Sequence, residues 1–179
     1  MGKEIQCSIL IHLLTHFSLI APVALISTSI RNVLYQRFTK IINEGGSPYQ
    51  FYLKSAKWLS VVGLPIFIIP VFAGPQLFSL FFGNNWSASG DYAAILSATY
   101  WVKLVASPLS SIFNSINKIK IASYWQTIST LTIISTLAVG VLLKFNVEQL
   151  LIIYAVHEVA TYGIYFLLGI YYVKKYQVG

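Results

Sequence analysis

The chain has 179 residues, of which 56% are hydrophobic and only 9% are charged. Soluble domains carry about 25% charged residues, and the mean hydropathy is +0.71, so the composition excludes a soluble globular domain. The net charge of +7 does not indicate nucleic-acid binding, because the basic residues lie at the ends of apolar segments, where the positive-inside rule places them. The composition predicts an all-α integral membrane protein.

Five apolar segments are long enough to cross a bilayer. A hydrocarbon core of about 30 Å requires roughly 20 apolar residues in a helix. We therefore expect one transmembrane domain over residues 1–179, a helix bundle with spans at about 7–30, 58–82, 92–116, 121–143 and 149–173. The third segment is the least apolar, and we expect it to be the most deeply buried in protein.

The connections between these segments alternate in charge. Basic residues dominate 31–57, 118–120 and the tail at 174–175, whereas 83–91 has no base and the two charges of 144–148 cancel. The positive-inside rule then predicts that the basic connections and the C-terminus are cytoplasmic. The N-terminus would lie outside without a signal of its own, so we expect that helices upstream of this chain are missing.

The basic connection between the first two segments has two interpretations. Apolar residues interleaved with bases over 33–42 predict a helix lying in the membrane interface, and Gly45-Gly46-Ser47-Pro48 would end it. The connection is either a solvated loop whose bases only fix topology, or a docking surface for anionic lipid headgroups or a lipid diphosphate. Its basic residues are Arg31, Arg37, Lys40, Lys54 and Lys57.

A lysine lies near the middle of the third predicted span. A charge at that depth costs at least about 2.5–3.5 kcal/mol, and Lys103 is too far from either end to reach water along the helix. Polar groups at steps of three and four share its face. They are Tyr100, Lys103, Ser107, Ser110 or Ser111, and Asn114. This stripe predicts a helix interface or an aqueous path.

The fifth predicted span has a matching stripe: Tyr154, Glu158, Thr161 or Tyr162, and Tyr165. With opposing helix directions, Glu158 is expected at nearly the depth of Lys103. Either the two form a buried pair that holds the helices together, or one or both face a central cavity. Both interpretations hold if the pair breaks during transport. His157 is expected to hydrogen-bond between helices rather than to bind a metal.

The sequence offers little for catalysis. No nucleophile–base pair, phosphate-cradling glycine loop or carboxylate dyad is present, and the single cysteine belongs to no metal-ligand cluster. We therefore expect neither an enzyme nor a metal or organic cofactor. Ser and Thr residues of the fourth span, from Ser123 to Thr136, are interpreted as contacts between packed helices.

One stretch resembles a known family. The pattern Phe82-Gly83-x-x-Trp86-x-x-x-Gly90-x-Tyr92-Ala93, followed by Ser107-Pro108-Leu109-Ser110-Ser111-x-Phe113-Asn114, is similar to the C-terminal half of bacterial polysaccharide flippases. These are the O-antigen and exopolysaccharide translocases of the multidrug/oligosaccharidyl-lipid/polysaccharide exporter superfamily. Asn84-Asn85 departs from the acidic turn that is commoner in that group.

The resemblance implies a function that composition alone does not give. It implies most of the second lobe of a two-lobe transporter in the bacterial cytoplasmic (inner) membrane, with the N-terminal lobe missing. Its cargo would be a polyprenyl diphosphate-linked oligosaccharide, the repeat unit of lipopolysaccharide O-antigen or exopolysaccharide, and its coupling ion H⁺ or Na⁺. Lys103 would then meet the anionic cargo, and Glu158 is the first candidate for coupling. The alternatives are a cation-coupled multidrug antiporter, a non-transporting assembly subunit and a truncated remnant.

Overall fold

The computed structural model describes residue 25 and residues 27–178, and this part of the chain consists of helices with no strand. A helix covers 27–43. It is followed by α2 (Pro48–Phe82), η1 (Asn84–Trp86), α3 (Ser87–Leu109), α4 (Ser111–Ser115), α5 (Ile119–Leu142) and α6 (Val147–Val178). The predicted all-α fold is confirmed, while most of the first predicted span lies outside the described residues.

Local signals explain where α2 begins and ends. The Ser47 side chain accepts a hydrogen bond from the Gln50 amide and caps the helix, and Pro48 occupies its first turn, where no backbone donor is needed. At the other end Gly83 has a φ of 94°, a conformation that glycine adopts without a steric penalty. The break expected at 45–48 is therefore present, and α2 starts well before the apolar segment at Trp58.

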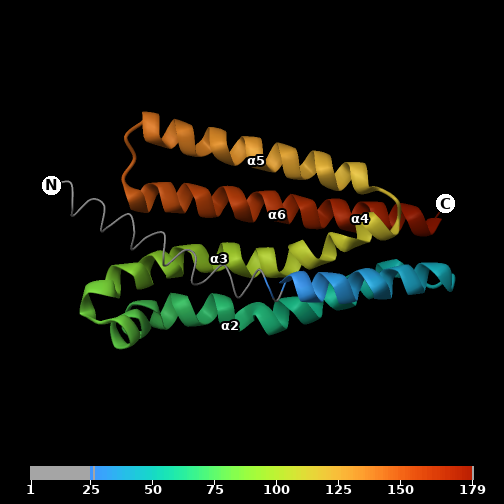
Figure 1. Ribbon diagram of the computed structural model, residues 1–179, viewed down its shortest axis with the longest axis horizontal. Coiled ribbons are helices and arrows are strands. Elements are labelled where there is room, and N and C mark those ends of the chain that lie inside the picture. The colour runs from blue at the N-terminus through green and yellow to red at the C-terminus, as the bar shows by residue number, and fades with distance from the viewer. Residues whose placement is uncertain (1–24, 26, 179) are drawn as a thin grey trace.

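The third predicted span is divided into two helices. α3 ends at Leu109, and α4 begins at Ser111. Pro108 has no amide hydrogen, and the Ser110 side chain donates to the Ser107 carbonyl, so local side-chain bonding replaces part of the helical ladder. The chain bends here without leaving the bundle (Figure 1).

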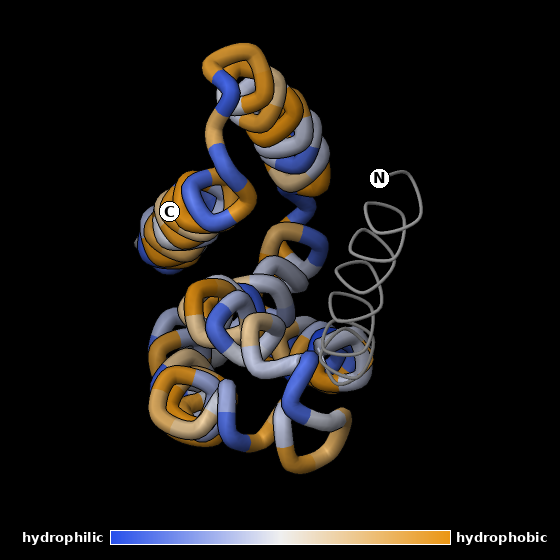
Figure 2. Tube along the Cα trace, turned by 90° about the vertical axis from the view of Figure 1, so that its left-hand side faces the viewer, coloured by the Kyte–Doolittle hydropathy of each residue, from blue (hydrophilic) through white to orange (hydrophobic). Residues whose placement is uncertain are grey.

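α3 occupies the centre of the bundle. It packs against α2 and α6, whereas α5 packs only on α6 and α4 among the labelled elements. The end-on view of Figure 2 shows α5 and α6 above the group that contains α2 and α3, and α6 packs on α3. The expectation that the third segment is the most buried in protein agrees with this central position.

Small residues allow α2 and α3 to approach closely. A Cβ on Gly90 would overlap the backbone of Gly74 and Pro75, so the two helices touch backbone to backbone at this point. Close approach at glycine is the usual mode of helix packing in membranes.

A cluster of apolar side chains fills the opposite end of the bundle. Its fully buried aromatic members, Phe38 and Tyr52, join the helix over 27–43 to α2, and Phe113 of α4 stacks on Tyr165 of α6 at 5.3 Å. The Tyr52 hydroxyl also donates to the Phe166 carbonyl at 3.1 Å, which ties α2 to α6.

Three helices of the described part, α2, α5 and α6, are long and apolar enough to cross a membrane. α3 is not among them, and it is also the helix with the most protein around it. Large apolar side chains are widely exposed along α2 and α5, which is the arrangement expected of a surface in contact with lipid.

The connections divide between the two ends of the molecule as their charges do. Figure 1 places the turn before α2, the turn between α4 and α5, and the C-terminal end of α6 together at one end. The turn at η1 and the connection between α5 and α6 lie at the other end. All three basic connections therefore share one end of the bundle.

Candidate functional site

Lys103 and Glu158 meet between α3 and α6. The Lys103 ammonium forms an ion pair with the Glu158 carboxylate, which is the contact that one of the two interpretations above expects. The expectation that the two spans run in opposing directions was wrong, because α3 and α6 run in the same direction (Figure 1). Lys103 lies in the second half of α3 and Glu158 in the first half of α6, and the two residues meet where these helices pack on one another.

Two tyrosines of α6 complete the surroundings of the ammonium group. Lys103 Nζ donates to the Tyr154 hydroxyl at 3.2 Å. The same atom lies 5.5 Å from the ring centroid of Tyr154 and 5.4 Å from that of Tyr162. Aromatic faces attract a cation at these distances, so the lysine is held by one carboxylate, one phenol and two rings.

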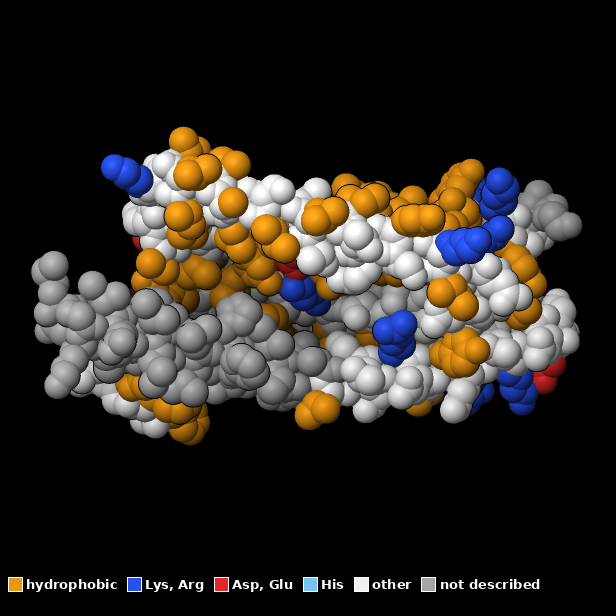
Figure 3. All heavy atoms as spheres, turned by 45° about the horizontal axis from the view of Figure 1, so that its top comes forward, with side chains coloured by type: hydrophobic (Ala, Val, Ile, Leu, Met, Phe, Trp, Pro, Cys, Tyr) orange, Lys and Arg blue, Asp and Glu red, His pale blue; other side chains and the backbone are white. Residues whose placement is uncertain are grey.

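The pair is unevenly exposed. The Lys103 side chain is 27% exposed and the Glu158 side chain only 7%. Figure 3 shows a basic and an acidic side chain side by side in a hollow at the middle of the molecule, bordered by hydrophobic side chains. A charged ligand in such a hollow would reach the ammonium group before the carboxylate.

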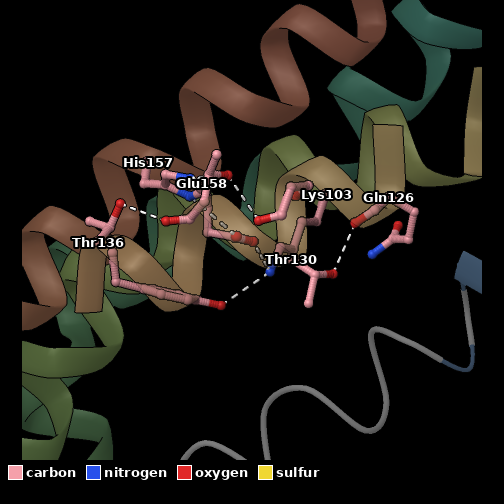
Figure 4. Close-up of polar contacts among 9 residues, drawn as sticks. Lys103, Gln126, Thr130, Thr136, His157 and Glu158 are labelled. Atoms are coloured by element: carbon pink, nitrogen blue, oxygen red, sulfur yellow. Dashed lines mark hydrogen bonds and ion pairs between the residues drawn. The ribbon is translucent and has the colours of Figure 1, made fainter. Parts of the chain in front are cut away.

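The histidine that precedes Glu158 in the chain contacts α5. His157 Nε2 lies 3.0 Å from the Thr132 hydroxyl of α5, which confirms the expected hydrogen bond between helices. His157 Nδ1 lies 3.7 Å from a Glu158 carboxylate oxygen, too far for a hydrogen bond. Figure 4 shows Lys103, Glu158 and His157 in one polar cluster, which we call the central cluster and which also includes Tyr154, Tyr162 and Thr132.

Among the other residues predicted for the cavity, Tyr100 lies beside Lys103 and Tyr154 of this cluster, whereas Ser107 and Asn114 lie further along the chain. Tyr100 is buried on α3, one turn before Lys103, and among the described residues its hydroxyl has no hydrogen-bond partner. Ser107 is half-buried and uses its carbonyl to accept from Ser110. Asn114 lies beyond the break at Ser110, on α4. The predicted polar stripe is therefore regular in the sequence, but in the structure the break between α3 and α4 divides it.

The five basic residues of the predicted docking surface lie on two helices. Arg31, Arg37 and Lys40 belong to the helix over 27–43, and Lys54 and Lys57 to the first turns of α2. All five are exposed. The helix over 27–43 packs lengthwise on α2, with Leu34 and Phe38 in the shared apolar cluster (Figure 1).

Sequence reasoning missed which hydroxyl of α5 contacts α6. Thr127, Thr130, Ser135 and Thr136 donate to carbonyls of their own helix, four residues back. Thr132 likewise donates to its own helix, to the Ser129 carbonyl, but its hydroxyl also contacts His157 across the interface. Ser and Thr recur throughout this part of α5, so nothing in the sequence distinguishes the hydroxyl that contacts α6 from the others.

The groups of the central cluster suit the binding of an anion. It presents one partly exposed cation, two phenols and an imidazole, and the carboxylate lies behind them. An anion can replace the carboxylate at the ammonium group, and the displaced carboxylate can then take up a proton or a small cation.

Comparison with known proteins gives one match. Residues 15–91 match the model of a family described as polysaccharide biosynthesis protein. No curated protein and no solved structure gives a significant match. The matched stretch includes α2 and the first part of the predicted motif, but it ends before Lys103 and Glu158. Over residues 15–91 this chain therefore shows the predicted likeness to the polysaccharide biosynthesis protein family.

Proposed function

We propose that this chain forms most of the second lobe of a flippase for lipid-linked oligosaccharides. Its cargo is a polyprenyl diphosphate-linked repeat unit, moved from the cytoplasmic to the outer leaflet of the bacterial cytoplasmic membrane during surface-polysaccharide assembly. The observation that carries the proposal is the central cluster: a cation held in the middle of a membrane-type helix bundle, with its ammonium group partly exposed. The match to a polysaccharide biosynthesis family agrees with it.

The uneven exposure of the ion pair favours binding over a purely structural role. Charges in the hydrocarbon region are expensive, and those that persist usually mark a path for substrate or ions. A pair that only joined two helices would gain most from excluding solvent at both partners. Here the carboxylate is buried and the ammonium group faces the hollow, as recognition of an anion requires.

The cycle follows from competition for one lysine. The cargo diphosphate, or acidic sugars of the repeat unit, takes the place of the Glu158 carboxylate at Lys103. Glu158 then becomes the group that binds H⁺ or Na⁺, and release of the cargo restores the pair. Tyr154 and Tyr162 keep the ammonium group in position during the exchange by hydrogen bonding and by cation–π attraction.

A transport assay in a strain that lacks the gene for this protein tests the proposal. The gene that encodes the chain is deleted, and the strain is supplied with the unmodified protein, with Lys103→Ala or with Lys120→Ala. Lys120 is exposed at the start of α5 and far from the central cluster in sequence, so it is the matched control. The measurement is the ratio of lipid-linked repeat units in the cytoplasmic and outer leaflets, at equal protein abundance in the membrane.

We expect Lys103→Ala to lower transport at least tenfold and Lys120→Ala to leave it unchanged. Full transport by Lys103→Ala would refute the role of the central cluster. An unaltered leaflet ratio in the deletion strain, together with increased sensitivity to cationic drugs, would indicate that the protein is a multidrug antiporter and not a flippase. An unaltered ratio with no drug phenotype would favour an assembly subunit.

A further inference from the structure

A groove runs between the helix over 27–43 and α2. It has a volume of about 250 Å³ and is lined by Ile30, Leu34, Phe51, Lys54, Ser55, Trp58 and Leu59. Apart from one lysine and one serine, its walls are apolar. None of these residues belongs to the central cluster, so the groove is a separate feature of the molecule.

The groove has a polar end and an apolar continuation. Lys54 and Ser55 each lie three or four residues from Phe51 and from Trp58, so all four residues share one face of α2. Lys54 lies toward the end of the bundle where the basic connections gather, and Trp58 lies one turn further along the helix. Trp58 is 58% exposed, and tryptophan favours the level of the lipid headgroups. The groove thus leads from the headgroup level into the apolar part of the bundle.

Lys54 is available to an anion. Glu44, the one acidic residue of the segment 31–57, is already paired with Lys40 at 3.7 Å. Within the described part of the chain no ion pair is formed by Lys54, or by the neighbouring bases Arg37 and Lys57. A positive charge without a counterion therefore lies at the mouth of an apolar groove.

We propose that this groove binds one anionic glycerophospholipid of the surrounding leaflet. The phosphate lies on Lys54, and one acyl chain follows the wall formed by Leu34, Trp58 and Ile30. A basic residue at the headgroup level attracts anionic lipid. The groove also gives the acyl chain an apolar wall to contact, which a basic surface alone would not offer. The occupant is a membrane phospholipid rather than transported cargo, because the groove shares no residue with the central cluster.

Quenching of tryptophan fluorescence by brominated lipids tests this site directly, because Trp58 forms part of its wall. The full chain is reconstituted in phosphatidylcholine vesicles with increasing amounts of phosphatidylglycerol or phosphatidylcholine brominated on the acyl chain. The unmodified chain is compared with Lys54→Gln, Lys57→Gln and Trp58→Phe. Lys57 is equally exposed but does not line the groove, so it controls for general surface charge. Trp58→Phe identifies the part of the signal that comes from the groove.

We expect saturable quenching with about a fivefold preference for the anionic lipid, as one lysine at the headgroup level provides. Trp58→Phe should remove the saturable component, Lys54→Gln should abolish the preference and Lys57→Gln should keep it.

Equal loss of the preference in Lys54→Gln and Lys57→Gln would mean that the lipid is attracted by the general surface charge and not bound at a site. Absence of Trp58 quenching would mean that another segment or protein covers the groove. Displacement by polyprenyl diphosphate at trace amounts would assign the groove to cargo. Each of these three results overturns the proposal, and none depends on the transport assay.

Discussion

At the scale of single residues, the energetic coupling between Lys103 and Glu158 can be measured. Removing one partner of a buried ion pair leaves a charge without compensation, whereas replacing both by apolar residues of similar size is often neutral or stabilising. We expect Lys103→Met and Glu158→Leu each to lower the stability of the protein, and the double variant to recover most of it. The coupling should be about 1–3 kcal/mol, measured by thermal unfolding in detergent.

The pair formed by Lys40 and Glu44 supplies the control. Its partners are four residues apart on one helix, and their side chains are 66% and 64% exposed. Exposed pairs of this kind contribute about 0.3–0.5 kcal/mol, so the same cycle with Lys40→Met and Glu44→Leu should give almost no coupling. Equal coupling in the two cycles would mean that burial does not strengthen the central pair. Recovery of stability without recovery of transport in the central double variant would separate folding from function.

At the scale of helices, the contact between α2 and α3 depends on the absence of a side chain at Gly90. A methyl group there would overlap the backbone of Gly74 and Pro75, which no rotamer change can relieve. We expect Gly90→Ala to destabilise the protein by about 1–3 kcal/mol, the usual cost of forced overpacking. Gly163→Ala on α6 is the control, because a methyl group there would meet no atom of another helix within 4 Å. Alanine is the better helix former, so this variant should unfold at the same temperature or above.

The attachment of α5 is the second prediction at this scale. α5 packs only on α6 and α4 among the labelled elements, and the hydrogen bond between the His157 imidazole and the Thr132 hydroxyl joins it to α6 through side chains. We expect Thr132→Val to accelerate amide hydrogen exchange along α5, since such bonds contribute about 0.6 kcal/mol in membrane proteins. Thr130→Val removes a hydroxyl that donates to a carbonyl of α5 itself, and it should leave exchange across the interface unchanged. Identical exchange in both variants would show that apolar packing alone holds α5.

At the scale of the whole molecule, sequence periodicity and charge predicted the features that depend on the position of a residue along the helix or along the membrane normal. The helical class follows from long apolar segments, and the break before α2 follows from Gly45-Gly46-Ser47-Pro48. The meeting of Lys103 and Glu158 follows from their positions near the middles of two spans. Each of these inferences needs only the depth of a residue along the membrane normal, which hydropathy records.

Features that depend on lateral position could not be predicted in this way. Hydropathy does not say which helix lies beside which, so the backbone contact at Gly90 and the bond between Thr132 and His157 were not predicted in their particulars. The break between α3 and α4 was visible only as Pro108, a residue that membrane helices also tolerate without breaking. Hydropathy alone marked only the apolar part of α2 from residue 58, although the helix already begins at Pro48.

The gathering of basic connections at one end of the bundle makes a prediction about orientation in the membrane. Basic residues are retained on the cytoplasmic side, and Figure 1 places the turn before α2 and the end of α6 at the same end of the molecule. We expect these two segments to face the cytoplasm, and the turn at η1 and the start of α6 to face outward. Single cysteines in a Cys7→Ser background report the side, at Glu44→Cys and Gln177→Cys for one end and Asn85→Cys and Glu148→Cys for the other.

Labelling intact cells with a membrane-impermeant maleimide distinguishes the two ends. All four positions are exposed, so access to the reagent depends on the side of the membrane and not on burial in the protein. Asn85→Cys and Glu148→Cys should react in intact cells, whereas Glu44→Cys and Gln177→Cys should react only after permeabilisation. The reverse pattern would place the basic end outside and contradict the direction of transport proposed above. Reaction of Glu44→Cys and Asn85→Cys from the same side would mean that α2 does not cross the membrane, because these residues flank its two ends.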